Sequence, residues 1–167
     1  SGGANVPGSS AIKLQTDNGI INVLGKIYMY GPQTAADDNY NNHGSGGSIW
    51  LKANNISGSG IMNASSNPSS RSGSGGRIAL VSSNLINFSG TINNNGFKGS
   101  TLNYGSGGTV YINASQVYLT GATIDVSGFN GSTAGADWGQ RINISASVIQ
   151  LSGIYNASKI NQSNSAT

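Results

Sequence analysis

Carboxylates are the groups of this chain best suited to acid–base chemistry, and they are few. The 167 residues include five Asp, no Glu and one His. Hydrolysis of a polysaccharide usually needs a pair of carboxylates facing the scissile bond. The carboxylates here are dispersed along the chain: Asp17, Asp37, Asp38, Asp125 and Asp137. We therefore expect no catalytic residues and interpret the chain as not an enzyme.

Metal-binding candidates are limited to one pair of residues. Asp37 and Asp38 offer the oxygen ligands that Ca²⁺ prefers, but no Gly and Glu follow at the spacing of an EF-hand loop. His43 lies among Asn and Gly residues and is interpreted as a solvated loop residue. The absence of Cys excludes thiolate metal sites and disulfides. The sequence thus predicts no cofactor and no metal, with Asp37 and Asp38 as the calcium candidates.

Two aromatic residues could recognise a sugar or a partner protein. Trp50 and Tyr111 occupy the same position in two of the repeats described below. Stacked strands would hold them roughly 10 Å apart on the outer surface, with the small Ala79 between them. Flat rings so spaced can stack on sugar rings or enter a protein interface. Both interpretations remain open.

Asn-x-Ser sequences offer covalent attachment sites for glycans. Six of them are expected in accessible positions: Asn55, Asn87, Asn113, Asn130, Asn143 and Asn161. Two more, Asn63 and Asn156, are expected to point inward in an amide ladder along the stack. That inward column would also hold Met29, Asn94 and Val126. The chain is therefore expected to carry glycans on its outer positions.

A repeat positions all of these residues. Gly-Ser-Gly-Gly followed by alternating apolar residues occurs at 44–51, 73–80 and 105–112, with looser copies at 8–14 and 138–144. The first apolar residues of the copies are 29 to 37 residues apart: Ile12, Ile49, Ile78, Val110 and Ile142. Such a period is typical of a solenoid, whose repeats bury their apolar side only against neighbouring repeats.

Alternation of apolar and polar residues predicts three short strands in each repeat. The first strand has a second inward position, at Leu14, Leu51, Leu80, Ile112 and Ile144. The inward points expected of the second strand are Ile20, Ile56, Leu85, Val117 and Ile149. Those expected of the third strand are Ile27, Ile61, Ile92, Ile124 and Ile154. We predict an all-β fold, a right-handed parallel β-helix of about five three-sided turns, essentially without helix.

Polar loops of variable length separate the repeats and are expected at one corner of the solenoid. The glycines that close these loops are expected to adopt positive φ. We place the β-helix at residues 8–156, a flexible or subunit-contact segment at 1–7, and a polar C-terminal tail at 157–167.

Charge and hydropathy exclude two classes of partner. The net charge is +3 and no run of basic residues occurs, whereas a nucleic-acid surface needs clustered Lys and Arg. An apolar stretch of about 18 residues is also missing, so insertion into a membrane is not expected.

The Gly-Ser-Gly-Gly units and the Ser-Gly-x-Ile segments that follow them resemble the Gly/Ser/Asn-rich right-handed parallel β-helices of secreted or cell-surface microbial proteins. The resemblance covers roughly residues 8–156 and rests on structural motifs. It implies an extracellular, cell-surface location and a role in adhesin stalks, fibres or polysaccharide handling. Proteins of this shape also include polysaccharide-cleaving enzymes.

The ends of the predicted solenoid lack the pattern of a capping repeat, which would leave strand edges open. Either the chain belongs to a longer β-helix, or its ends meet neighbouring subunits head to tail in a filament. We expect a glycosylated, self-associating structural subunit of an extracellular fibre or cell-surface adhesion structure. The alternative is a carbohydrate-binding module that contacts a polysaccharide or the cell surface through Trp50 and Tyr111. A polysaccharide lyase or hydrolase is the third hypothesis.

Overall fold

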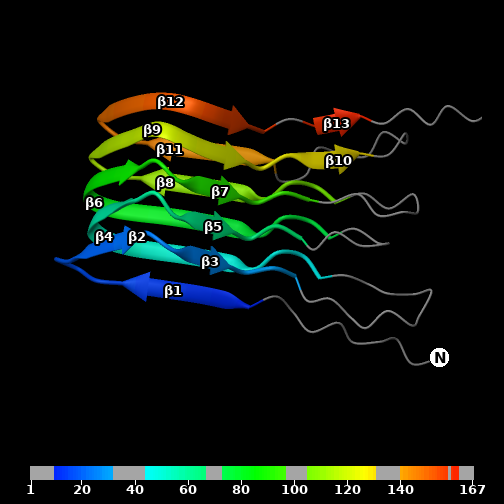
Figure 1. The fold of residues 1–167 in the computed structure, drawn as a ribbon, viewed down its shortest axis with the longest axis horizontal. Coiled ribbons are helices and arrows are strands. Elements are labelled where there is room, and N and C mark those ends of the chain that lie inside the picture. Colours follow the sequence, from blue (N-terminus) through cyan, green and yellow to red (C-terminus); the bar gives the residue numbers. More distant parts are fainter. Residues whose placement is uncertain are drawn as a thin grey trace, which may run out of the picture.

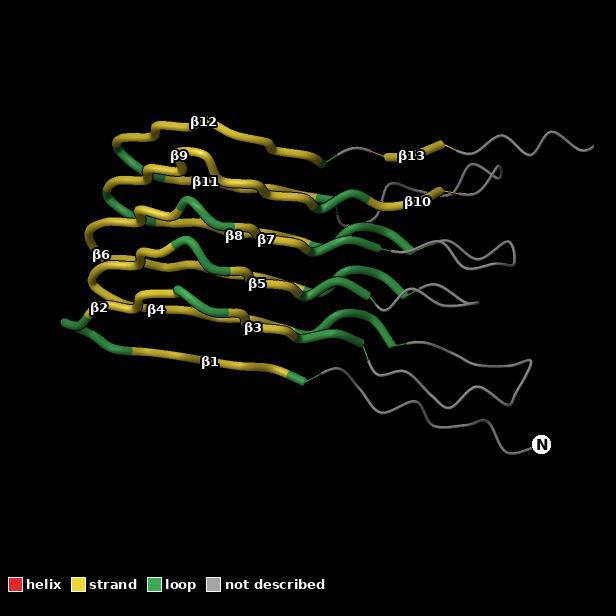
Figure 2. Tube along the Cα trace, viewed as in Figure 1, coloured by secondary structure: helices red, strands yellow, loops and turns green. Residues whose placement is uncertain are grey.

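The computed structural model describes residues 10–31, 44–66, 73–96, 105–130, 140–157 and 159–161. All regular elements in these ranges are β-strands, and all strand pairs are parallel. The strands stack in layers along one axis, from β1 at one end to β12 at the other (Figure 1). The described part contains no helix (Figure 2), as the sequence predicts.

Each repeat contributes one layer, which we call a rank. The first sides of the five ranks pair in the order β1–β4–β6–β8–β11. The strands that begin on this first side are β1 (Ala11–Gln15), β4 (Ser48–Gly58), β6 (Arg77–Phe88), β8 (Thr109–Asn113) and β11 (Arg141–Ser145). Aligned repeat positions are in register: Ile12 pairs with Ile49, and Ile49 with Ile78.

The chain then turns a corner and runs along a second and a third side. The remaining strands are β2 (Ile20–Val23), β3 (Lys26–Tyr28), β5 (Ile61–Asn63), β7 (Thr91–Asn93), β9 (Gln116–Asp125) and β12 (Val148–Asn156). The second side holds β2, the later parts of β4 and β6, and the first parts of β9 and β12. The third side holds β3, β5, β7 and the later parts of β9 and β12. A separate pair forms from β10 (Gly128–Asn130) and β13 (Lys159–Asn161), so part of the expected C-terminal tail is a strand.

Glycine shapes the corner between the second and third sides. Gly58, Gly121 and Gly153 have φ values of 132°, 75° and 141°, a region that residues with a Cβ rarely adopt. The first corner is made differently. There β4 continues through the bend, and its pairing with β6 shifts register between Ala53 and Asn55.

The described residues form a parallel β-solenoid of about three turns, so the expectation of about five is wrong. The repeat occurs five times, but only the three middle ranks have a neighbour on both sides among the described strands. The outer ranks, β1–β3 and β11–β12, therefore leave their inward side chains partly open to solvent.

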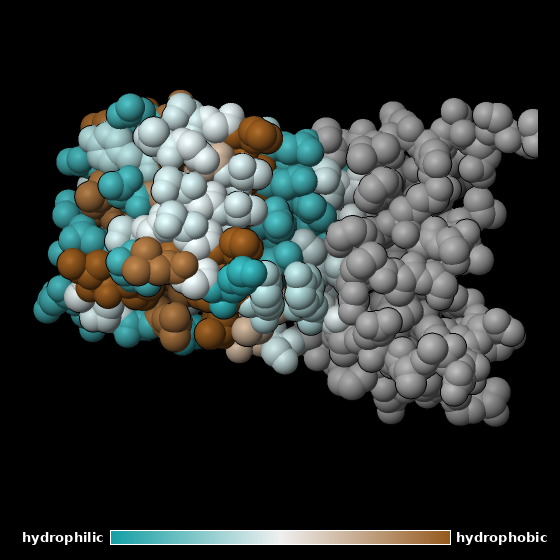
Figure 3. Space-filling model, in the orientation of Figure 1, coloured by the Kyte–Doolittle hydropathy of each residue, from teal (hydrophilic) through white to brown (hydrophobic). Residues whose placement is uncertain are grey.

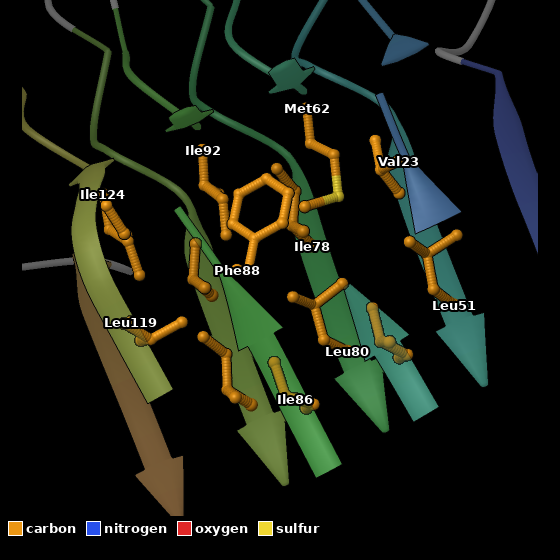
Figure 4. Close-up of a cluster of buried hydrophobic side chains, with 14 of the residues drawn as sticks. Val23, Leu51, Met62, Ile78, Leu80, Ile86, Phe88, Ile92, Leu119 and Ile124 are labelled. Carbon is orange, nitrogen blue, oxygen red and sulfur yellow. The ribbon is translucent and has the colours of Figure 1, made fainter. Parts of the chain in front are cut away.

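The interior is a set of apolar columns that run from rank to rank. Leu80 lies between Leu51 and Ile112, and all three are fully buried. This confirms the alternation predicted for the first side. On the second side Phe88 fills the interior between the ranks, and its ring lies close to Met62, Ile92 and Ile78 (Figure 4).

The predicted inward points of the second and third sides are wrong by one residue in several ranks. Ile21 and Ile86 form the second-side column with Ile56 and Val117, while Ile20 is 67 % exposed and Leu85 faces outward. On the third side the column contains Met62 and Tyr155, not Ile61 and Ile154. In each case two adjacent apolar residues occur, so alternation alone does not select between them.

The same shift changes the column expected to form an amide ladder. Asn63 and Asn156 align with Tyr28, Asn93 and Asp125, not with Met29, Asn94 and Val126. Asn63 is nearly buried, but its amide donates to the Tyr30 hydroxyl and its side-chain oxygen accepts from the Ser65 N–H. Asn63 therefore caps a local turn and contacts the neighbouring rank through a tyrosine hydroxyl, not through an Asn–Asn amide ladder.

The glycines of the Gly-Ser-Gly-Gly units serve close packing, and none of them has positive φ. A Cβ at Gly46, Gly75 or Gly107 would overlap the carbonyl oxygen of Ala64, Asn94 or Val126. Backbone hydrogen bonds run from Gly47 to Met29, from Gly76 to Ala64 and from Gly108 to Asn94, at 2.7 to 2.8 Å. These bonds hold together the residues that flank three of the four variable loops, at the corner where the sequence places the loops.

Candidate binding face on the first side

A hollow of about 410 Å³ opens on the outer surface of the first side. Trp50 and Tyr111 stand on its two sides, with Ala79 and Val81 on the strand between them. Arg77 and Ser48 line the hollow near the start of the strands. The register confirms that Trp50 and Tyr111 lie two ranks apart, roughly 10 Å by the spacing of parallel strands.

A lysine holds the indole of Trp50. The Lys13 ammonium lies 4.4 Å from the centre of the Trp50 ring, within the range of a cation–π interaction. Lys13 pairs with Trp50 in the neighbouring rank, so the side chain reaches across one strand spacing. One face of the indole is thereby occupied, and the ring is restrained next to the hollow.

The other aromatic residue is restrained through its hydroxyl. The Asn113 amide donates a 2.8 Å hydrogen bond to the Tyr111 hydroxyl from two residues along the same strand. Between the rings, Ala79 is only 6 % exposed although its side chain points outward. We attribute its burial to the larger side chains on the adjacent strands. The two rings and the small residue between them form a shallow apolar floor.

Cations surround this floor. On the five strands of the first side, residues at alternate positions point outward, as the buried positions between them show. Four of these outward residues are basic: Lys13, Lys52, Arg77 and Arg141. None of the outward positions on β1, β4, β6, β8 and β11 is acidic. The linear sequence does not reveal this cluster because consecutive members are 25 to 64 residues apart, although aligning the repeats column by column would have found it.

The acidic residues of the described part lie elsewhere. Asp17 follows β1 and accepts a 3.3 Å hydrogen bond from the Gln15 amide. Asp125 is on the third side, where its carboxylate accepts from the Ser127 N–H and the Asn95 amide at 3.0 and 3.2 Å. Asp125 thus stabilises a turn, and it forms no pair of facing carboxylates with Asp17. Asp37, Asp38, His43 and Asp137 lie outside the described residues.

The glycosylation candidates differ in accessibility. Asn87 and Asn143 are exposed, whereas Asn55 and Asn113 are partly buried. Asn55 also accepts a 2.9 Å hydrogen bond from the Asn84 amide. Asn130 and Asn161 are placed only by their backbone, in β10 and β13.

In the described ranges, no three His, Cys, Asp or Glu residues gather as metal ligands would. A helix of the length and apolarity needed to cross a membrane is also missing from those ranges.

The fold and the face together define a parallel β-solenoid with an aromatic, basic outer side. No family model matches the chain, and no curated protein or solved structure shows significant similarity to it.

Proposed function

We propose that this chain is a structural subunit of an extracellular fibre or cell-surface adhesion structure. In this proposal the subunits stack end to end and continue the solenoid from one copy into the next. The coil is taken to be right-handed, the hand that parallel β-crossovers favour.

The supporting observation is that inward side chains are partly exposed at both ends of the described stack. Leu14 is 40 % exposed at the first rank, whereas Leu51 and Leu80 in the same column are fully buried. At the last rank Ile149 and Leu151 are each 46 % exposed, although they pair with the buried Val117 and Leu119. Figure 3 shows the apolar band near the β1–β3 end. Burying a fully exposed apolar side chain is worth about 1.5–3 kcal/mol, so covering side chains that are already more than half buried is worth roughly half as much for each.

The two ends are complementary because they belong to the same columns. A copy whose β1 pairs with β11 of its neighbour would place Ile12 on Ile142 and Leu14 on Ile144, as aligned positions do inside the chain. The edges of β1 and β11 each have a partner on one side only among the described strands, and open edges accept further strands. A contact between unlike ends does not close on itself, so it generates a filament.

Complementary blocking of the two ends tests this proposal. Leu14→Asp blocks the first end and Leu151→Asp blocks the last, and Leu85→Asp on the outward second side is the control. We expect the unmodified chain and Leu85→Asp to form filaments, each end variant alone to be monomeric, and an equimolar mixture of the two end variants to form dimers. Analytical ultracentrifugation measures all five samples. A monomeric unmodified chain at high concentration would overturn end-to-end assembly, and dimers of either variant alone would overturn its head-to-tail direction.

The proposal includes glycosylation at outward Asn residues. Mass spectrometry of natively produced protein should find glycans at the exposed Asn87 and Asn143, and none at Asn63, which is only 9 % exposed. Glycans at Asn63, or wholly unmodified native protein, would contradict this part of the proposal.

A further inference from the structure

We infer that the first side binds an acidic polysaccharide, a glycan chain that carries carboxylate groups on its sugar rings. The chain would lie along the solenoid axis across β4, β6 and β8. This inference does not depend on end-to-end assembly, because the face lies on the side of the stack.

The aromatic pair supplies the surface for sugar rings. Trp50 and Tyr111 flank the 410 Å³ hollow, and Ala79 and Val81 lie between them. Sugar rings have an apolar C–H face that can rest on such a surface, while aromatic side chains contribute large area with few rotatable bonds. Both rings are held in place beforehand, by Lys13 and by Asn113. Restrained groups lose less conformational entropy when a ligand binds.

The charges select an acidic sugar over a neutral one. Arg77 lines the hollow beside Trp50, and Lys52 lies two residues from Trp50 on β4. Arg77 and Arg141 both pair with Thr109, one on each side of its strand. Their side chains therefore extend from backbone positions two ranks apart, roughly 10 Å. Guanidinium binds carboxylate with two parallel hydrogen bonds. Among the described residues, no outward position on the first-side strands carries a carboxylate that would compete for these cations.

A polyuronate fits this arrangement better than a nucleic acid does. Nucleic-acid strands carry phosphates about 3.4 Å apart along a duplex and gain affinity mainly from the number of phosphates neutralised. Arginines two ranks apart would leave most of those phosphates unpaired. A glycan with one carboxylate per sugar ring places its charges more sparsely and offers apolar ring faces between them.

Binding of a hexaglucuronate to the full-length chain, measured by isothermal titration calorimetry at low salt, tests the inference. Trp50→Ala and Tyr111→Ala should each weaken binding at least about tenfold, and Arg77→Gln about fivefold. The matched controls Tyr118→Ala and Lys26→Gln, on the second and third sides, should change it less than about twofold. Arg77 is exposed, so its variant is expected to fold even if an aromatic variant does not. Circular dichroism checks folding in each case.

Two further ligands test whether the face recognises the carboxylate groups and the sugar rings. The same hexasaccharide with its carboxyl groups reduced should bind at least about tenfold more weakly, because the charge-assisted hydrogen bonds are lost. Oligothymidylate with the same number of charges should bind more weakly than the hexaglucuronate. Equal binding of the reduced sugar, tighter binding of the oligonucleotide, or unchanged binding in both Trp50→Ala and Arg77→Gln would each overturn the inference.

Discussion

The buried side-chain amide of Asn94 donates a 3.0 Å hydrogen bond to the carbonyl oxygen of Thr109, across the corner where the polar loops leave the solenoid. The same amide also donates to the Gly76 carbonyl at 3.0 Å. One side chain thus links the end of one rank to the first-side strands of the same and the next rank. Asn94 is fully buried, so these bonds form away from water.

Removing this amide should destabilise the corner. We expect Asn94→Ala to lower the free energy of unfolding by about 1–3 kcal/mol, because it removes two buried hydrogen bonds and leaves a small void. The adjacent Asn93 faces outward and is the matched control, with an expected change for Asn93→Ala within about 0.5 kcal/mol. Urea denaturation measures both, and equal losses would show that the assignment of inward and outward faces is incorrect there.

Close backbone packing at the Gly-Ser-Gly-Gly units predicts a steric effect. A Cβ at Gly75 would overlap the Asn94 carbonyl oxygen, so Gly75→Ala should cost about 1–3 kcal/mol through displacement of the two chain segments. A Cβ at Gly25 would meet no heavy atom within 4 Å, and the φ of Gly25 is not positive. Gly25→Ala should therefore leave the melting temperature nearly unchanged or raise it slightly. Similar melting temperatures for the two variants would contradict this explanation of the motif.

The corrected second-side column predicts opposite behaviour for two neighbouring residues. Ile86 is fully buried, whereas Leu85 points outward. Ile86→Ala should lower the free energy of unfolding by about 2–5 kcal/mol, and Leu85→Ala by no more than about 1 kcal/mol. Chemical denaturation of the two variants checks this. A larger loss of unfolding free energy for Leu85→Ala than for Ile86→Ala would show that Leu85 belongs to the inward column, as expected from alternation.

Stability should depend on alkaline pH through Tyr155. Burial raises the pKa of Tyr155 above its ordinary value of 10.0, and its hydroxyl donates a 2.7 Å hydrogen bond to the Leu119 carbonyl. The folded protein thus holds this proton more tightly than the unfolded chain does. The resulting stabilisation is fully present below the unfolded pKa and is lost as pH rises through the folded pKa.

The variant Tyr155→Phe isolates this contribution. It should be less stable than the unmodified protein near neutral pH because it lacks the hydroxyl hydrogen bond. Its melting temperature should fall less between about pH 8 and pH 11, because this position no longer titrates. If the melting temperatures of the two proteins fell equally over this pH range, a contribution from Tyr155 would be ruled out.

Much of the fold follows from period and alternation. The spacing of Ile49, Ile78 and Val110 predicts parallel stacking, because only aligned repeats can bury their apolar sides against one another. Strict alternation around Leu51, Leu80 and Ile112 selects the inward face of the first side, since side chains in a strand point to opposite faces. The position of Trp50 and Tyr111 on one outer column follows from the same two features.

The tertiary structure alone decided what lies beyond the corners and how residues from distant repeats combine. Adjacent apolar residues such as Leu85 and Ile86 satisfy alternation in either register, and the bend of the backbone at the first corner selects Ile86. The number of closed turns depends on neighbours, because a rank buries its interior only when another rank covers it. Arg77 and Arg141 are isolated charges in the sequence and become members of one basic face only when parallel pairing through Thr109 brings their strands together.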